Sequence, residues 1–149
     1  MAEKVKRRVF ISYAHASEEH QVWVKKLADS LRTQSILVTL DQDDLRLGQL
    51  IRKFQSEGIS LADRVLVICS ESYVEKCDTD KASGAGQEKE LIGVEVKGDQ
   101  GTVKFIPILR NNQTANMPLC LRGRLWLDGN RDQDFDDMVK RLSAEIKRP

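Results

Sequence analysis

Short apolar runs and helical stripes alternate along this chain. Each apolar run is three to five residues long and mostly free of charge, which is typical of a strand covered on both faces of a sheet. We expect strands over Arg8–Ser12, Ile36–Leu40, Val65–Cys69, Phe105–Leu109 and Leu125–Leu127. Pro107, inside the fourth run, indicates reduced pairing there because proline cannot donate a backbone hydrogen bond.

Helical spacing fills most of the intervals between these runs. Val24, Leu27, Ala28 and Leu31 recur at the spacing of one helical stripe, and Ser17 stands where an N-cap residue is expected. Further helices are expected over residues 50–58, 70–76, 88–96 and 135–146. The polar segments expected to be loops are Asp41–Gln49 and Asp78–Gly86.

Strands that alternate with helices imply right-handed crossovers and an α/β fold. Five such units favour a five-stranded parallel sheet in the flavodoxin-like order 2-1-3-4-5, with helices on both faces. In that order a ligand binds beyond the carboxyl ends of strands one and three, where the winding direction reverses. The sequence therefore predicts a site near Ser12–His15 and Ser70–Glu88.

The composition fits one globular domain over residues 1–149, with a core over about 8–146, which can be one module of a longer protein. Apolar residues make up 40% and charged residues 32%, and the net charge is +1, so we expect no general affinity for nucleic acid or acidic membranes. No apolar run approaches the roughly 20 residues of a membrane span. Three widely spaced cysteines argue against a disulfide framework and favour a reducing cytoplasm.

No metal site is expected. His15 and His20 are five residues apart, which misses the spacing of a helical zinc pair, and we expect both at the surface. The aspartates of residues 41–44 do not make a calcium loop, because Arg52 stands where the last ligand would be. Trp23 and Trp126 are expected to pack in the core or half-buried.

Five stretches, in this order and spacing, resemble Toll/interleukin-1 receptor (TIR) domains, particularly those of bacteria. VFISYAHASEEHQVWVKKLADSL (Val9–Leu31) looks like the family's first strand and helix, and LDQDDLRLGQ (Leu40–Gln49) is similar to its BB loop. ADRVLVICSESYVEKC (Ala62–Cys77) and KFIPIL (Lys104–Leu109) match its third and fourth strands. GAGQEKELI (Gly84–Ile92) resembles the glycine-rich entry to the helix that carries the family's catalytic glutamate.

The resemblance implies one of two activities. Some TIR domains are adaptors that signal by TIR–TIR association, and others cleave the nicotinamide–ribose bond of NAD to release nicotinamide and ADP-ribose or a cyclic relative. In the enzymes NAD is the substrate and no bound cofactor or metal is required. A bacterial relative of this kind would act in the cytoplasm in immune signalling, or as an effector secreted into a host cytosol.

The resemblance also implies which carboxylate acts. Cleavage builds positive charge on the ribose, and one nearby carboxylate can stabilise that charge because nicotinamide leaves as a neutral molecule. Glu88 is the first candidate because it follows Gly84 and Gly86 at the bacterial spacing, and Glu90 is the runner-up because it directly precedes apolar residues. A third interpretation is that both are solvated near a helix N-terminus, where the helix dipole favours them.

Further residues are assigned from the same resemblance. Those expected to shape the substrate pocket are Tyr13, Ala14, His15, Asp43 and Leu50. Those expected at a self-association interface, with this chain or other TIR domains, are Asp44, Leu45, Arg46, Leu47 and Gly48. Two positions depart from the family pattern, since Gln87 and Asp44 stand where aromatic residues are common, and both bear on whether the chain is active.

Overall fold

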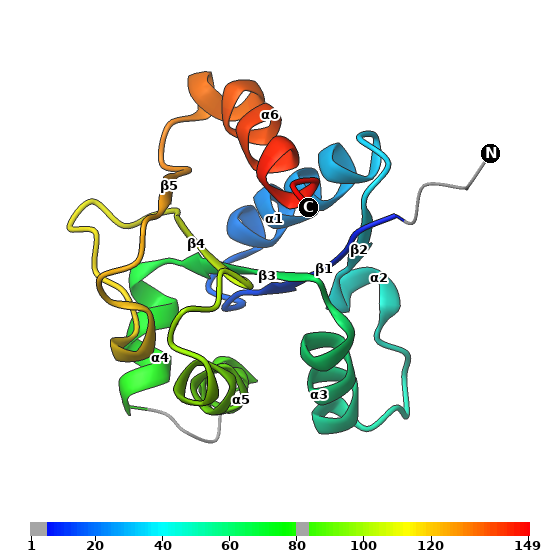
Figure 1. Ribbon diagram of the computed structural model, residues 1–149, viewed down its shortest axis with the longest axis vertical. Helices are drawn as coiled ribbons and strands as arrows, with labels where there is room; N and C mark the ends of the chain where they lie inside the picture. The colour runs from blue at the N-terminus through cyan, green and yellow to red at the C-terminus, as the bar shows by residue number, and fades with distance from the viewer. Residues whose placement is uncertain (1–5, 80–83) are drawn as a thin grey trace.

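The computed structural model describes residues 6–79 and 84–149 and contains one five-stranded parallel sheet (Figure 1). The strand order is β2-β1-β3-β4-β5, as predicted, with parallel pairing throughout. The strands are β1 (Arg8–Ser12), β2 (Leu37–Thr39), β3 (Arg64–Cys69), β4 (Phe105–Leu109) and β5 (Leu127–Asp128). The carboxyl ends of β1 and β3 therefore lie side by side at one rim.

Helices cover both faces of the sheet, and Figure 1 shows the two layers. The helices α1 (Glu18–Arg32) and α6 (Phe135–Ile146) pack on one face, against strand side chains that include Ile11, Leu66 and Ile108. The opposite face carries α3 (Ile51–Leu61), α4 (Glu71–Thr79) and α5 (Gly84–Gly98). The strands contribute alternate side chains to these two cores, which explains why their sequences are apolar without interruption.

Local sequence explains where the helices start and how they pack. Ser17 accepts a hydrogen bond from the backbone N–H of His20 and so caps α1, as expected. The stripe of Val24, Leu27, Ala28 and Leu31 is buried, as expected, and α6 buries Phe135, Met138, Val139, Leu142 and Ile146. In α3, a Cβ added to Gly58 would lie 2.4 Å from the Phe10 ring, so glycine is what lets this helix approach β1 closely.

Several predicted boundaries were wrong. The expected loop Asp41–Gln49 begins with one helical turn, α2 (Asp41–Asp44), because backbone N–H groups of Asp44 and Leu45 bond back to Leu40 and Asp41. Of the loop expected over 78–86, residues 80–83 lie outside the described residues, whereas α4 extends to Thr79 and α5 starts at Gly84. The fifth strand is Leu127–Asp128 and pairs with Ile108 and Leu109 of β4. On its other edge β4 pairs with β3 along all five residues, Pro107 included, so the reduced pairing expected at Pro107 is found toward β5 and not toward β3.

Two side chains are not where the sequence placed them. His20 was expected at the surface but is 1% exposed, with Nδ1 3.2 Å from the side-chain amide of Asn111. Burial lowers its pKa, so the imidazole is uncharged at neutral pH. Trp126 precedes β5 and keeps 37% exposure, whereas Trp23 is buried as expected, beneath the Arg110 guanidinium.

Candidate active site

Glu88 sits one turn into α5 and faces the carboxyl end of β1. Its Oε1 accepts a hydrogen bond of 3.3 Å from Gln55 Nε2 of α3, and Ser12 at the end of β1 neighbours the same carboxyl group. Oε2 is buried and has no hydrogen-bond partner within the described part of the chain. A buried carboxyl oxygen without a hydrogen-bond partner destabilises a folded protein, and such groups are often explained by a catalytic or binding role.

Burial dominates the electrostatics of this carboxyl group. Removal from water is the main reason that the pKa of Glu88 is raised to about 8; the negative charge of Asp41 acts in the same direction, and the neighbouring Ser12 hydroxyl and the hydrogen bond from Gln55 act in the opposite one. At neutral pH the free chain therefore holds Glu88 mainly protonated. A cation brought next to it would favour the carboxylate, because opposite charge stabilises the ionised form.

A second buried pair supports the floor of the site. Ser12 Oγ and Tyr73 Oη are 2.8 Å apart, and neither side chain is exposed to solvent. Tyr73 comes from α4, so this hydrogen bond joins the end of β1 to the first helix after β3. It fixes Ser12 beside Glu88.

Asp41 organises the outer part of the site. Its carboxylate accepts a hydrogen bond of 2.7 Å from Tyr13 Oη and lies 2.6 Å from His15 Nε2. Burial acts to raise the pKa of Asp41, but hydrogen bonds from His15 and Tyr13 outweigh it and the pKa is lowered. The hydrogen bond with Asp41 raises the pKa of His15. Gln42 donates to Tyr13 Oη at 2.8 Å and completes the network.

The structure brings some of the predicted residues together and places others elsewhere. Tyr13 and His15 lie at the Asp41 network, and their ring centroids are 4.8 Å apart. Ala14 is buried against the α3 face of the sheet. Asp43 points to α1, where Lys25 and Arg32 contact it at 2.8 and 2.6 Å. Leu50, which precedes α3, is 72% exposed.

The two candidate glutamates face different parts of the molecule. Glu90 is exposed and lines a groove on the far side of α5, next to Gly93 and Lys97. Two residues along a helix are about 200° apart, so both glutamates cannot face the same site. Of the two, only Glu88 lies among Ser12, Gln55 and the Asp41 network.

The predicted interface loop projects from the domain at its tip. Leu47 is fully exposed, Gly48 has a positive φ of 86°, and Leu45 alone packs partly on the core. Asp44 caps its own turn by accepting a hydrogen bond from the backbone N–H of Leu40. The tip therefore offers an apolar side chain to solvent, while the base of the loop is held by hydrogen bonds.

Two site residues escaped the sequence analysis, namely Asp41 and Gln55, whereas Ser12 and Tyr73 lie within the ranges predicted for the site but were given no role of their own. Ser12 is the last residue of one predicted strand, and Asp41 directly follows the last residue of another. Both positions are at the carboxyl end of a strand, which is where a ligand site is expected in this fold. The sequence offers no reason to assign Gln55 to the site, because a polar residue within a helix is expected to face solvent unless the packing is known. Among the described residues no group of three metal-ligating side chains is present, and no described helix is long and apolar enough to cross a membrane.

Comparison with known proteins agrees with this fold. A profile of the TIR domain family matches residues 9–143. A prokaryotic SEFIR domain of known structure superposes with a TM-score of 0.76 and 32% identity, covering 97% of this chain and 94% of that one. The TIR domain of the Toll-related receptor TRR-2 from Hydra magnipapillata gives 0.68 at 17% identity, over 94% and 98% of the two chains. The chain belongs to the TIR domain family.

Relatives of known activity are similar over most of this chain. BtTIR of Bacteroides thetaiotaomicron, a 2' cyclic ADP-D-ribose synthase, is 36% identical over 89% of this chain and 44% of its own length. The NAD(+) hydrolase TcpA of a Theionarchaea archaeon is 28% identical over 85% and 36%. This chain thus spans less than half the length of these two relatives.

Proposed function

We propose that this TIR domain cleaves the nicotinamide–ribose bond of NAD, releasing nicotinamide and either ADP-ribose or a cyclic ADP-ribose. The observation that carries the proposal is the buried, incompletely hydrogen-bonded carboxyl group of Glu88 at the carboxyl ends of β1 and β3. The family membership and the activities of BtTIR and TcpA support it.

The chemistry needs one carboxylate. When the bond from ribose C1 to the nicotinamide nitrogen breaks, its electron pair goes to the nitrogen and the positive charge passes from the ring to the ribose. Glu88, ionised beside that charge, stabilises the oxocarbenium-like transition state in a site from which water is largely excluded. Water, or a hydroxyl group of the same molecule, then adds to C1 and loses a proton, which gives the linear or the cyclic product.

Because its pKa is raised, Glu88 is mainly protonated in the free chain and must lose its proton to act. The nicotinamide ring of bound NAD is positively charged, and a positive charge beside a buried carboxyl group lowers its pKa. Binding of the substrate is therefore expected to convert Glu88 to the carboxylate. Tyr13, His15 and Asp41 surround the same rim and offer hydroxyl, imidazole and carboxylate groups to the hydroxyls of a ribose. Gln55, Ser12 and Tyr73 hold Glu88 in place from below.

The test is incubation of the purified chain with NAD at high protein concentration, followed by chromatography for nicotinamide. We expect release by the wild type, loss in Glu88→Ala and Glu88→Gln, and retention in Glu90→Ala, with each fold checked by circular dichroism. Loss in Glu90→Ala together with full activity of Glu88→Ala would overturn the assignment of Glu88. No release by the wild type, even in an assembled state, would overturn the enzymatic proposal.

A second proposed function is TIR–TIR association, and the exposed loop tip favours it. Leu47 is fully exposed and Leu50 is 72% exposed, which leaves two large apolar side chains available for a partner. The resistosome protein Roq1, whose TIR domains superpose with a TM-score of 0.56 at 17% identity, shares the fold. Association and catalysis are compatible, because a neighbouring copy could cover the rim at which Glu88 lies. We place both activities in a bacterial cytoplasm, in immune signalling or as an effector.

A further inference from the structure

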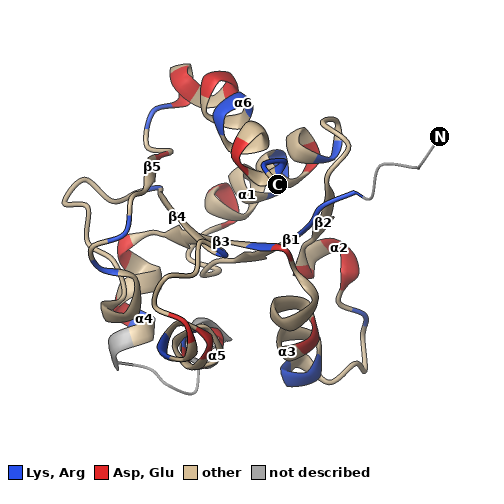
Figure 2. Cartoon of the chain, in the orientation of Figure 1, with Lys and Arg blue, Asp and Glu red and all other residues tan. Residues whose placement is uncertain are grey.

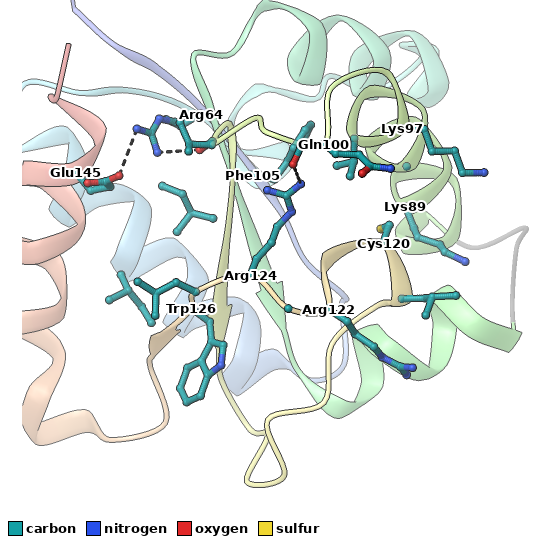
Figure 3. Close-up of a pocket in the computed structure, with 18 of the residues that line it drawn as sticks. Arg64, Lys89, Lys97, Gln100, Phe105, Cys120, Arg122, Arg124, Trp126 and Glu145 are labelled. Carbon is teal, nitrogen blue, oxygen red and sulfur yellow. Dashed lines mark hydrogen bonds and ion pairs between the residues drawn. The ribbon is translucent and has the colours of Figure 1, made fainter.

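A large groove lies on the opposite side of α5 from Glu88. Its volume is about 1560 Å³, and its walls are α5, the β4–β5 side of the sheet, the segment before β5, and α6. In Figure 3 Lys89 and Lys97 project from α5, Arg122 lies on the segment facing them, and Arg64 and Glu145 close the far end. The proposed NAD reaction uses none of these side chains.

The groove is strongly cationic although the chain is nearly neutral. Its lining contains two carboxylates, Glu90 and Glu145, against seven cations, namely Arg64, Lys89, Lys97, Arg122, Arg124, Arg141 and Arg148. Glu145 is already shared by Arg64 and Arg148, at 3.4 and 3.1 Å. Since the chain as a whole has a net charge of +1, the rest of the molecule carries an excess of negative charge. Figure 2 shows blue segments along the chain that leads into β5.

Some of these cations are free to meet a ligand. Among the described residues, Arg122 donates through Nε alone, to the carbonyl of Met117 at 3.2 Å, which leaves its two terminal nitrogens available for a carboxylate. Lys97 and Arg141 make no ion pair or side-chain hydrogen bond within the described part of the chain. Arg124 instead holds the groove wall, because it donates to the carbonyls of Gln100 and Thr102.

The rim of the groove is apolar. Four aliphatic side chains there are 65–84% exposed, namely Val94, Val103, Leu119 and Leu125. Trp126, which keeps 37% exposure, extends the same surface (Figure 3). Tryptophan and arginine are enriched among the residues that contribute most to binding at protein interfaces. Large exposed apolar patches are typical of such interfaces.

Size and side-chain type together select the kind of ligand. Small-molecule sites have volumes of roughly 300–1,000 Å³, so this groove is larger than a typical small-molecule site, which favours a segment of polypeptide as its ligand. Single-stranded nucleic acid is held by rows of aromatic side chains on which bases stack. Here the exposed apolar groups are aliphatic apart from Trp126, which favours aliphatic side chains in the partner.

We propose that this groove docks an acidic amphipathic segment of a partner protein, with its carboxylates on Lys97, Arg122 and Arg141 and its apolar side chains on the rim. The loop tip of a second copy does not fit this chemistry. From Leu45 to Ser56 the sequence has no carboxylate and carries Arg46, Arg52 and Lys53. The three aspartates before it are engaged within their own domain.

The test uses a fluorescent helical peptide of Leu and Glu with one apolar stripe, its Lys-for-Glu counterpart, and an oligothymidine of similar length. Binding is followed by fluorescence anisotropy for the wild type and for the double variant Lys97→Glu/Arg141→Glu. The control Arg52→Glu/Lys140→Glu makes the same change in net charge at exposed positions outside the groove. Glu88 and its neighbours are unchanged in all of them, so NAD cleavage provides a separate readout.

We expect the wild type and the control variant to bind the acidic peptide, and the groove variant to bind it at least about tenfold more weakly. Binding should weaken with salt and when Ser replaces Leu in the peptide. Equal binding by the two double variants, or tighter binding of the oligothymidine or the basic peptide, would refute the proposal. Self-association of the wild type that only the groove variant loses would refute it too, since a second copy would then be the occupant.

Discussion

Replacing Glu88 by Gln is expected to stabilise the fold at neutral and alkaline pH, whatever it does to activity. The amide keeps the shape of the side chain and can still accept a hydrogen bond from Gln55, but it cannot ionise. The folded chain holds the carboxyl group with a pKa of about 8, against 4.5 for an unperturbed glutamate. Between these two values the folded state keeps a proton that the unfolded state has lost, so stability falls as pH rises.

The size of the effect follows from the same pKa values. Each pH unit in this window removes about 1.4 kcal/mol from the free energy of unfolding. The wild type should therefore lose about 2 kcal/mol by pH 6 and about 3 kcal/mol by pH 7, relative to a chain in which the group cannot ionise. Below pH 4.5 Glu88 is protonated in both the folded and the unfolded chain, so its ionisation costs the wild type no stability. Above pH 8 both are ionised and the difference stays constant.

The assay is urea unfolding, followed by tryptophan fluorescence, of the wild type and Glu88→Gln across pH 4 to 9. Titrating groups that do not interact with Glu88 cancel because the two proteins are compared at the same pH. Glu90→Gln is the control, since Glu90 is exposed and its replacement should leave the curve unchanged. A difference between wild type and Glu88→Gln that does not vary with pH would refute the link between burial and ionisation.

A parallel series of kcat/KM for NAD should rise with pH toward an apparent pKa near 8, because the ionised form is the active one.

Four further substitutions test packing and association. Gly58→Ala should destabilise the chain by about 1–3 kcal/mol in the same urea titration, because the new Cβ would meet the Phe10 ring. Gly93→Ala should instead stabilise α5 by up to about 1 kcal/mol, because no atom lies within 4 Å of the new Cβ. Tyr73→Phe should cost about 1–3 kcal/mol, since it removes a buried hydrogen bond, and a loss close to zero would contradict the pairing with Ser12. Leu47→Asp should abolish any rise of specific activity with protein concentration while leaving unfolding unchanged; a rise that persists in this variant would exclude the loop tip as the interface.

The fold was predictable because its signals are local and repeated. Continuous apolar runs such as Val65–Cys69 can be satisfied only by a strand buried on both faces, and the alternation with helices leaves few topologies. The five-stranded order followed from that alternation alone. Short elements were missed where the signal is weak: α2 is a single turn held by backbone hydrogen bonds to Leu40 and Asp41, and one turn is too short to show a helical periodicity in the sequence.

The site was predictable only in outline. The strand ends predicted where a site would lie, and resemblance to the TIR family proposed Glu88 as the catalytic residue, but neither predicted the contact of Glu88 with Gln55. Gln55 and Tyr73 come from helices distant in sequence, and their meeting at Glu88 depends on how α3 and α4 pack. His20 was misplaced for a similar reason, since its burial depends on Asn111, which is 91 residues away.

The gathering of cations in the groove also gives the molecule a permanent electric asymmetry. Near its isoelectric point of about 7.7 the chain has almost no net charge, yet one side presents a dense positive field and the remainder a diffuse negative one. Such a molecule turns as it approaches a charged surface, so orientation precedes contact. One practical consequence is chromatographic. The chain should be retained on a sulfonate resin at a pH where its net charge predicts that it flows through.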